Sequence, residues 1–87
     1  MPHREPNYIS CCELVEPLPA DFEASNKFVK LRAACGIDIR KTAKMFSIDL
    51  GQYLQLERGE LAFRDWRRCM EVMCILSNKP FDLIDRV

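Results

Sequence analysis

The chain has 87 residues, which suits one small domain, and 48% of them are hydrophobic, which excludes an intrinsically disordered protein. No apolar run approaches the ~20 residues that cross a bilayer, and residues 1–10 lack the apolar stretch of a secretory signal, so we expect a cytoplasmic protein without a membrane partner. The net charge is zero, but residues 27–68 carry ten bases and five acids between two acidic ends, so the basic middle can still bind an anionic partner.

Residues 1–20 contain four of the five prolines, and Tyr8–Val15 between them favours extended structure. Two interpretations of this segment remain open. It is either a short strand or arm that packs on a partner, or a disordered tail, because chain ends are loose unless they are tied down. We therefore divide the chain into a Pro-containing N-terminal arm, residues 1–20, and a helical domain, residues 21–87.

The first predicted helix begins near Asp21 or Ser25, both good N-caps, and ends at Gly36, which can adopt the left-handed conformation that closes a helix. Between these limits, apolar residues recur at the helical spacings of three and four: Phe28, Leu31 and Cys35.

A second helix follows, capped by Asp38 and running to about Phe46, with Thr42, Ala43 and Phe46 facing inward. Residues 47–49 make a tight connection to a third helix. Asp49 caps that third helix, which is expected from Leu50 to Arg58 and is terminated by Gly59.

A longer fourth helix is predicted from Arg64 to Ser77, and a short last helix has Pro80 in its first turn and ends near Ile84. The apolar stripe of the fourth helix comprises Trp66, Cys69, Met70, Met73 and Leu76. Trp66 either completes the core or belongs to an exposed patch beside Leu61–Phe63 that binds another protein. Residues 22–87 contain no alternating polar and apolar run, so we expect no sheet there.

The segment from Gly36 to Glu60 resembles the helix-turn-helix of phage Cro and repressor proteins, the XRE-like or lambda-repressor-like family. Two short helices joined by a three-residue turn, with a glycine after the second, are the core of that motif. The matching features are Leu31-Arg32 ahead of Gly36, Ala43 in the second helix, Ile48 in the turn, and Leu56-Glu57-Arg58-Gly59-Glu60 at the end. The resemblance covers about residues 27–84 and implies an all-α, compact five-helix domain, here with an extended N-terminal arm.

Each matching residue has a physical reason to be where it is. Ala43 is small because the third helix crosses close to it, Ile48 fills the corner between the two helices, and Gly59 allows a positive φ. In proteins of this type, an arginine late in the first helix pairs with a glutamate late in the third. The resemblance therefore implies an ion pair between Arg32 and Glu57, and the alternative is that both are solvated surface groups.

The resemblance also implies that the third helix enters the major groove of DNA and touches base edges with its N-terminal residues. Gln52 and Gln55 are the candidate base readers, since glutamine can bond adenine in two places, and Leu50 can contact a thymine methyl group. The candidate contacts to the phosphate backbone are Arg40, Lys41, Lys44 and Arg58.

Three positions depart from the family pattern, namely Ile39, Leu50 and Gly51, and so does the segment after Gly59. Ile39 stands where a glutamine normally grips a phosphate, Gly51 offers nothing to a base, and the segment after Gly59 is Glu60–Phe63 where basic residues are common.

Metal, cofactor and catalytic chemistry have little support in the sequence. The five cysteines are irregularly spaced with no CxxC pair, and the one histidine is His3, so no zinc site or disulfide framework is expected. Cys35, Cys69 and Cys74 are interpreted as small buried hydrophobic residues. We expect no cofactor and no enzymatic activity.

The sequence thus predicts a small sequence-specific transcription regulator, of phage or bacterial type, that binds double-stranded DNA as a homodimer. The candidate dimer surfaces are Pro80–Val87 and Tyr8–Val15. The alternative is a protein-binding module on the same scaffold, such as a phage inhibitor, an antirepressor or an antitoxin-like partner.

Overall fold

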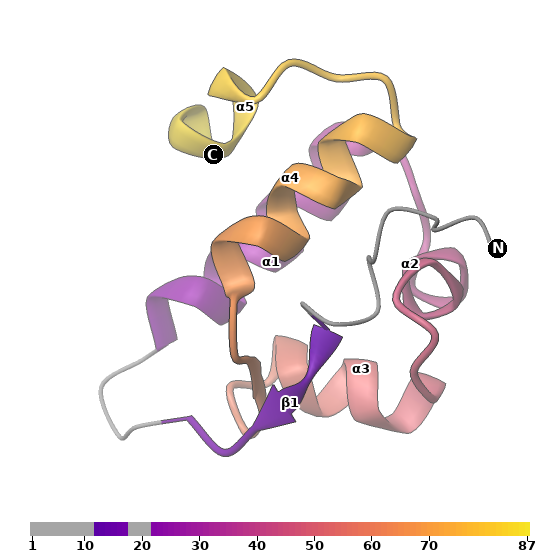
Figure 1. Ribbon diagram of the computed structural model, residues 1–87, viewed down its shortest axis with the longest axis vertical. Coiled ribbons are helices and arrows are strands. Elements are labelled where there is room, and N and C mark those ends of the chain that lie inside the picture. Colours follow the sequence, from indigo (N-terminus) through magenta and orange to yellow (C-terminus); the bar gives the residue numbers. More distant parts are fainter. Residues whose placement is uncertain (1–11, 18–21) are drawn as a thin grey trace, which may run out of the picture.

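The computed structural model describes residues 12–17 and 22–87, and this part of the chain forms five helices and one two-stranded sheet (Figure 1). In chain order the elements are β1 (Leu14–Val15), α1 (Phe22–Cys35), α2 (Ile39–Met45), α3 (Leu50–Glu57), β2 (Ala62–Phe63), α4 (Trp66–Leu76) and α5 (Asp82–Arg86). The predicted helical class is therefore confirmed, with a small sheet added to it. No helix in the described ranges is long and apolar enough to cross a membrane.

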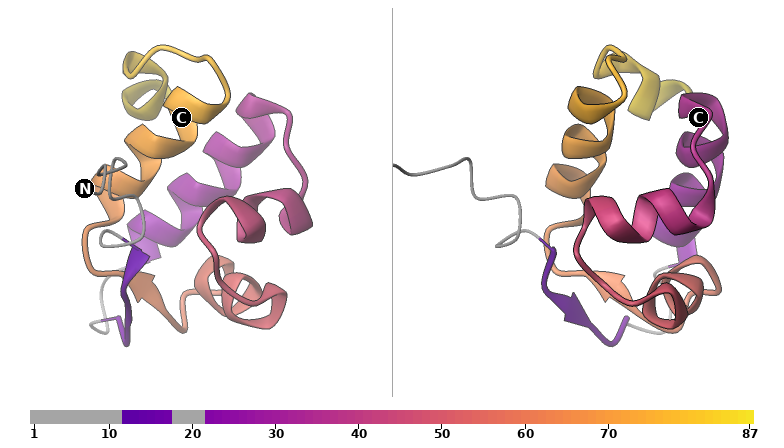
Figure 2. Two further views of the ribbon diagram at one scale, coloured as in Figure 1. Left: turned by 45° about the vertical axis from the view of Figure 1, so that its right-hand side comes forward. Right: turned by 90° about the vertical axis from the view of Figure 1, so that its right-hand side faces the viewer.

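The helices are arranged along the long direction of the molecule. α1 and α4 pack side by side in its middle, α5 lies at one end, and α3 lies at the other end beneath α2 (Figures 1 and 2). The strand pair lies at the α3 end in all three views. The two ends therefore present different elements to a partner.

The first four helices all end in the same way. A left-handed residue lies one or two positions after each helix, and the next backbone N–H donates to the carbonyl five residues earlier, which satisfies a carbonyl that the helix leaves open. The left-handed residues are Gly36, Ser47, Gly59 and Asn78. Gly36 and Gly59 confirm two predicted helix ends, whereas Ser47 and Asn78 adopt this conformation despite carrying a side chain.

The helix starts agree with the sequence in part. Asp38 caps α2 as predicted, since its Oδ1 accepts a 2.7 Å hydrogen bond from the Lys41 N–H. Ser25 is buried inside α1 and is not an N-cap, and Asp21, the other candidate, lies outside the described residues. The fourth helix begins at Trp66 and not at Arg64, because Asp65 caps it through the Arg68 N–H.

The expectation that residues 22–87 contain no sheet is wrong. β2 pairs antiparallel with β1, with Leu14 opposite Phe63 and Val15 opposite Ala62. A strand of two residues is too short to show an alternating pattern, and its partner lies far away in the chain. Leu14–Val15, at the end of the Tyr8–Val15 segment that is expected to be extended, is therefore a strand, while residues 8–11 lie outside the described ranges.

Three phenylalanine rings from three different elements meet in the core. Phe28 of α1, Phe46 at the end of α2 and Phe63 of β2 have ring centroids 4.9 to 6.4 Å apart. All three rings are almost completely buried, as is Cys12 just before β1. The tilted and edge-to-face arrangement is the one that aromatic quadrupoles favour. The aromatic cluster thus joins α1, α2 and the sheet.

α4 contributes a largely buried side to the core, made of Cys69, Met70, Val72, Met73 and Cys74. Trp66 is half-buried and packs against this core, so its predicted core role is met in part. Leu76, which the sequence assigns to the apolar stripe, is 47% exposed because it lies at the end of the helix. The last helix begins at Asp82, after Pro80, and ends at Arg86.

Replacing Phe46 with alanine should lower the free energy of unfolding by about 3–5 kcal/mol, because it leaves a cavity between three packed elements. Phe81→Ala is the matched control, since this ring is 46% exposed, and should change stability by about 0.5 kcal/mol or less. Urea denaturation followed by circular dichroism measures both, with Phe46→Leu as a milder variant if Phe46→Ala does not fold. Equal losses at positions 46 and 81 would contradict a core built on the aromatic cluster.

Candidate functional site

α2 and α3 form a closely packed pair joined by residues 46–49. Ser47 closes α2, and the Ile48 N–H donates to the Ala43 carbonyl at 3.1 Å, which turns the chain sharply. Ile48 is half-buried against the core, and Ala43 is buried, as the sequence predicts for both. The turn therefore holds α3 at a fixed angle to α2.

An ion pair links α1 to α3. Arg32 Nε lies 2.6 Å from Glu57 Oε2, and Arg32 Nη2 lies 3.3 Å from Glu57 Oε1, so the contact is bidentate. Only 18% and 11% of the two side chains are exposed, so water screens this pair weakly. Hydrogen bonding to Glu57 raises the pKa of Arg32, which stays charged. The predicted pair is confirmed, and it fixes the C-terminal half of α3 against α1.

Tyr53 lies next to this pair on the inward side of α3. Its side chain is fully buried, and its hydroxyl makes no hydrogen bond within the described part of the chain. Burial raises the pKa of the Tyr53 phenol well above its usual value, and the neighbouring Glu57 carboxylate adds to the rise. α3 is therefore held by a large apolar contact and a charged one on adjacent turns.

The opposite face of α3 is open to solvent. Gly51, Gln55 and Arg58 share this face, because their spacings of four and three residues bring them to one side of a helix. A side chain at Gly51 would meet nothing within 4 Å, which confirms that the face is uncovered. Gln55 is half-buried, and Arg58 is exposed but paired with Glu60 at 3.2 Å.

The other two α3 candidates are engaged within the protein. Gln52 is exposed, but its Oε1 accepts a 3.3 Å hydrogen bond from the Asp49 N–H at the start of the helix. Leu50 is half-buried and packs against the core. Gln55 is thus the candidate base reader whose side chain has no partner among the described residues. Gln52 would have to give up its hydrogen bond from the Asp49 N–H to bind a nucleotide base.

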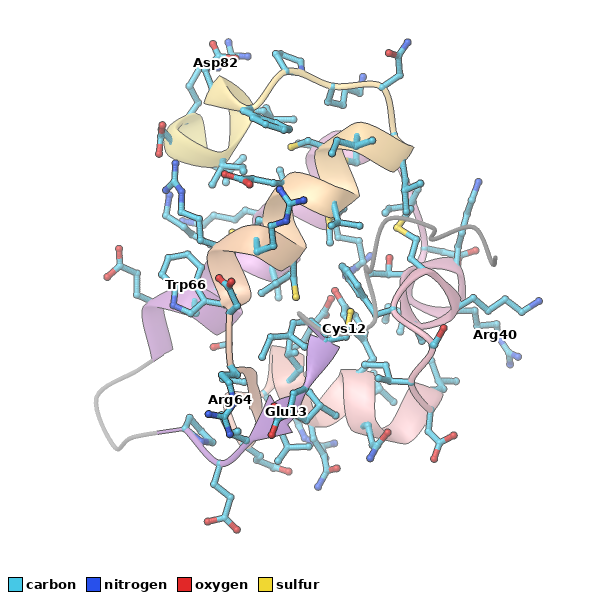
Figure 3. The ribbon with its side chains drawn as sticks, in the orientation of Figure 1. Cys12, Glu13, Arg40, Arg64, Trp66 and Asp82 are labelled. Atoms are coloured by element: carbon cyan, nitrogen blue, oxygen red, sulfur yellow. The ribbon has the colours of Figure 1, made fainter. Side chains whose placement is uncertain are left out.

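The three cations of α2 are exposed, and none of them pairs with a carboxylate in the described ranges (Figure 3 labels Arg40). They are Arg40, Lys41 and Lys44. Each of the other arginines in the described ranges has a carboxylate partner: Arg32, Arg58, Arg64, Arg67, Arg68 and Arg86. Positive charge is therefore left unpaired on α2, the helix that precedes α3.

The start of α2 carries an apolar side chain and no side-chain hydrogen-bond donor at position 39. Ile39 is half-buried against the core, and its hydrocarbon side chain has no group that could bind a phosphate. A shallow, open hollow lies beside it, lined by Arg32, Asp38, Ile39 and Arg40. Arg32 is paired with Glu57 and Asp38 is engaged in capping, so Arg40 is the cation of this hollow that is free to bind a ligand.

One basic residue near α3 was not predicted. Arg64 follows β2, and its backbone N–H and side chain both bind Glu13, at 2.7 Å to the carbonyl and 3.0 Å to the carboxylate (Figure 3). The β1–β2 pairing that brings these residues together leaves no periodic signal in the sequence. The sequence could show only that Arg64 is basic.

The cysteines agree with the expectation of buried hydrophobic residues in most respects. Cys69 and Cys74 are fully buried, and Cys35 is half-buried against the core. No cluster of three potential metal ligands occurs in the described ranges, while His3 and Cys11 lie outside them.

No family model matches the chain, and comparisons with curated proteins and with solved structures find no match. Function must therefore be argued from the side chains and their arrangement.

The raised pKa of Tyr53 predicts a loss of stability in alkaline solution. The unfolded phenol ionises near pH 10, whereas the folded phenol stays protonated, so stability falls as pH rises above ~10, by up to about 1.4 kcal/mol per pH unit. Tyr53→Phe removes this contribution. Urea denaturation at pH 8 and pH 11 should show the wild type losing stability relative to the variant, and parallel losses would disprove the burial of this phenol.

Proposed function

We propose that α2 and α3 act as a helix-turn-helix of the Cro and repressor type, and that the protein is a small sequence-specific transcription regulator that binds double-stranded DNA. Three features support the motif: the tight turn at Ser47–Ile48, the buried Ala43 of α2, and the Arg32–Glu57 pair. Together they hold a helix with one open face at the surface, which is what insertion into a major groove needs.

The observation that carries the proposal is the uncompensated charge of α2. DNA binding draws most of its affinity from cations that replace counterions at phosphates, and a cation already paired with a carboxylate contributes less. Arg40, Lys41 and Lys44 have no carboxylate partner in the described ranges and lie on the helix that precedes α3. We assign the phosphate contacts to these three residues.

Sequence readout falls to α3 in this proposal. Gln55 is the foremost base reader, because a free amide can donate to and accept from adenine at the same time. Gly51 lets the helix backbone approach the bases closely, since its face is open. Arg58 contacts a phosphate once it releases the Glu60 carboxylate. Gln52 and Leu50 are secondary candidates for base contacts, because both side chains are engaged within the protein.

A protein of this size reads enough DNA for specificity when two copies bind half-sites one helical turn apart. We propose a homodimer on DNA for this reason. Within Pro80–Val87, Phe81 is the exposed apolar residue, whereas Ile84 is buried in the protomer and is not available to a partner.

A second candidate function is favoured by a separate surface. Ile75, Leu76 and Phe81 are each 46–47% exposed, and they lie around the end of α4 and the start of α5, at the end of the molecule opposite α3 (Figure 1). Exposed apolar side chains that form one contiguous patch are typical of protein-binding surfaces. A protein-binding module would use this surface, and a partner there would leave α3 uncovered.

Removing one α2 cation should weaken binding to all DNA sequences alike. Lys44→Ala is expected to lower the slope of log affinity against log salt by about 0.9, because one phosphate contact is lost. Lys79→Ala is the matched control, since this exposed lysine also has no carboxylate partner in the described ranges but lies between α4 and α5. Fluorescence anisotropy with a mixed-sequence duplex measures both slopes, and identical slopes for the two variants would argue against the α2 surface.

Gln55 should affect specificity and leave general affinity alone. After a binding site has been selected in vitro with the wild-type protein, Gln55→Ala should lose about 1–3 kcal/mol at one base pair of that site and discriminate less at that position. Binding to mixed-sequence DNA should stay the same, since no phosphate contact is removed. An unchanged preference at every base pair would exclude Gln55 as a reader.

A further inference from the structure

We infer that Arg64 is a further phosphate-binding residue of this interface and that Glu13, from the N-terminal strand segment, restrains it. This inference rests on the proposed DNA-binding function, and it adds a regulatory contact to the same site. It starts from the Arg64–Glu13 ion pair, which joins residues 51 positions apart in the chain.

Arg64 lies at the end of the molecule that carries α3, where it can meet the same ligand as α3. It directly follows β2, and the strand pair lies at the α3 end in every view (Figures 1 and 2). Figure 3 shows Arg64 and Glu13 side by side next to this end of the fold. The segment between α3 and β2 carries Glu60, so Arg64 is the first base that the chain offers after Arg58.

The fold delivers the Glu13 carboxylate to Arg64. The Glu13 carbonyl accepts a 2.7 Å hydrogen bond from the Arg64 N–H, and the neighbouring residues Leu14 and Val15 pair with β2. Cys12, on the other side of Glu13, is buried in the core. Because the backbone is anchored on both sides of Glu13, its carboxylate stays near the guanidinium, whose Nη2 lies 3.0 Å from Oε2.

The pair is weak enough to be exchanged. Both side chains are mostly exposed, 64% for Arg64 and 56% for Glu13, and such surface pairs contribute about 0.2–1 kcal/mol. A phosphate at the DNA surface competes for the same guanidinium, so Glu13 reduces the affinity for DNA without abolishing it. The strand segment that carries Glu13 therefore lowers the affinity for DNA through this one ion pair.

The test compares two variants that make the same charge change at opposite ends of the molecule. Glu13→Gln releases Arg64 and keeps the backbone anchor, while Asp85→Asn releases Arg67 from a similar exposed pair in which Asp85 belongs to α5. Anisotropy titrations with a mixed-sequence duplex at low salt should show Glu13→Gln binding about three- to fivefold more tightly than wild type, with a much smaller change for Asp85→Asn. Thermal melting checks that both variants stay folded.

Arg64→Gln separates release of the arginine from simple loss of a negative charge. In the Glu13→Gln background it should abolish the gain, whereas in the wild type it should weaken binding by a smaller factor, since the Glu13 pair already offsets part of the phosphate contact. A gain that persists without Arg64, or equal gains from Glu13→Gln and Asp85→Asn, would overturn the inference while the proposed function stands. Absence of DNA binding by the wild type and by all variants would overturn the proposed function and this inference with it.

Discussion

The packing of three phenylalanine rings is the constraint to which the rest of the fold is adjusted. Phe28, Phe46 and Phe63 come from α1, the end of α2 and β2, so burying them together fixes three elements that are distant in the chain. Burying one such side chain contributes about 1.5–3 kcal/mol. Because Phe46 is also the C-cap residue that follows α2, the cluster sets where the turn into α3 begins. The open face of α3 is thus positioned from the core outward.

The Arg32–Glu57 pair has a different task from the aromatic cluster. A largely buried ion pair adds little net stability, since the desolvation of both charges offsets most of their attraction. Its bidentate geometry nevertheless allows only one arrangement of α1 against the end of α3. Tyr53 fills the space beside it, so rotation of α3 would expose an apolar ring as well as break the pair. Burial supplies the free energy of this contact, and the charges supply its orientation.

Local signals made most of the helices predictable, and the failures have a physical cause. Gly36, Gly59 and Asp38 mark helix ends through their own backbone or side-chain chemistry, which the sequence displays directly. Ser47 adopts the same left-handed conformation just after α2, but a serine in the sequence does not predict that conformation. The β1–β2 pair involves two residues a side and partners far apart, so no periodicity reveals it. The Arg32–Glu57 pair was predictable only from the family resemblance, and the Arg64–Glu13 pair had no signal.

Net charge conceals what the surface of this protein can bind. The whole chain is neutral, yet some of its opposite charges form ion pairs while others lie far apart. Six described arginines are compensated within a few ångströms, so their fields are short-ranged. The cations of α2 form no ion pair with a carboxylate of the described residues, and Asp38, at the start of the same helix, is engaged in capping, so their field extends into solvent. An anionic partner responds to that local excess and not to the sum, which is why a neutral chain can carry a surface suited to DNA.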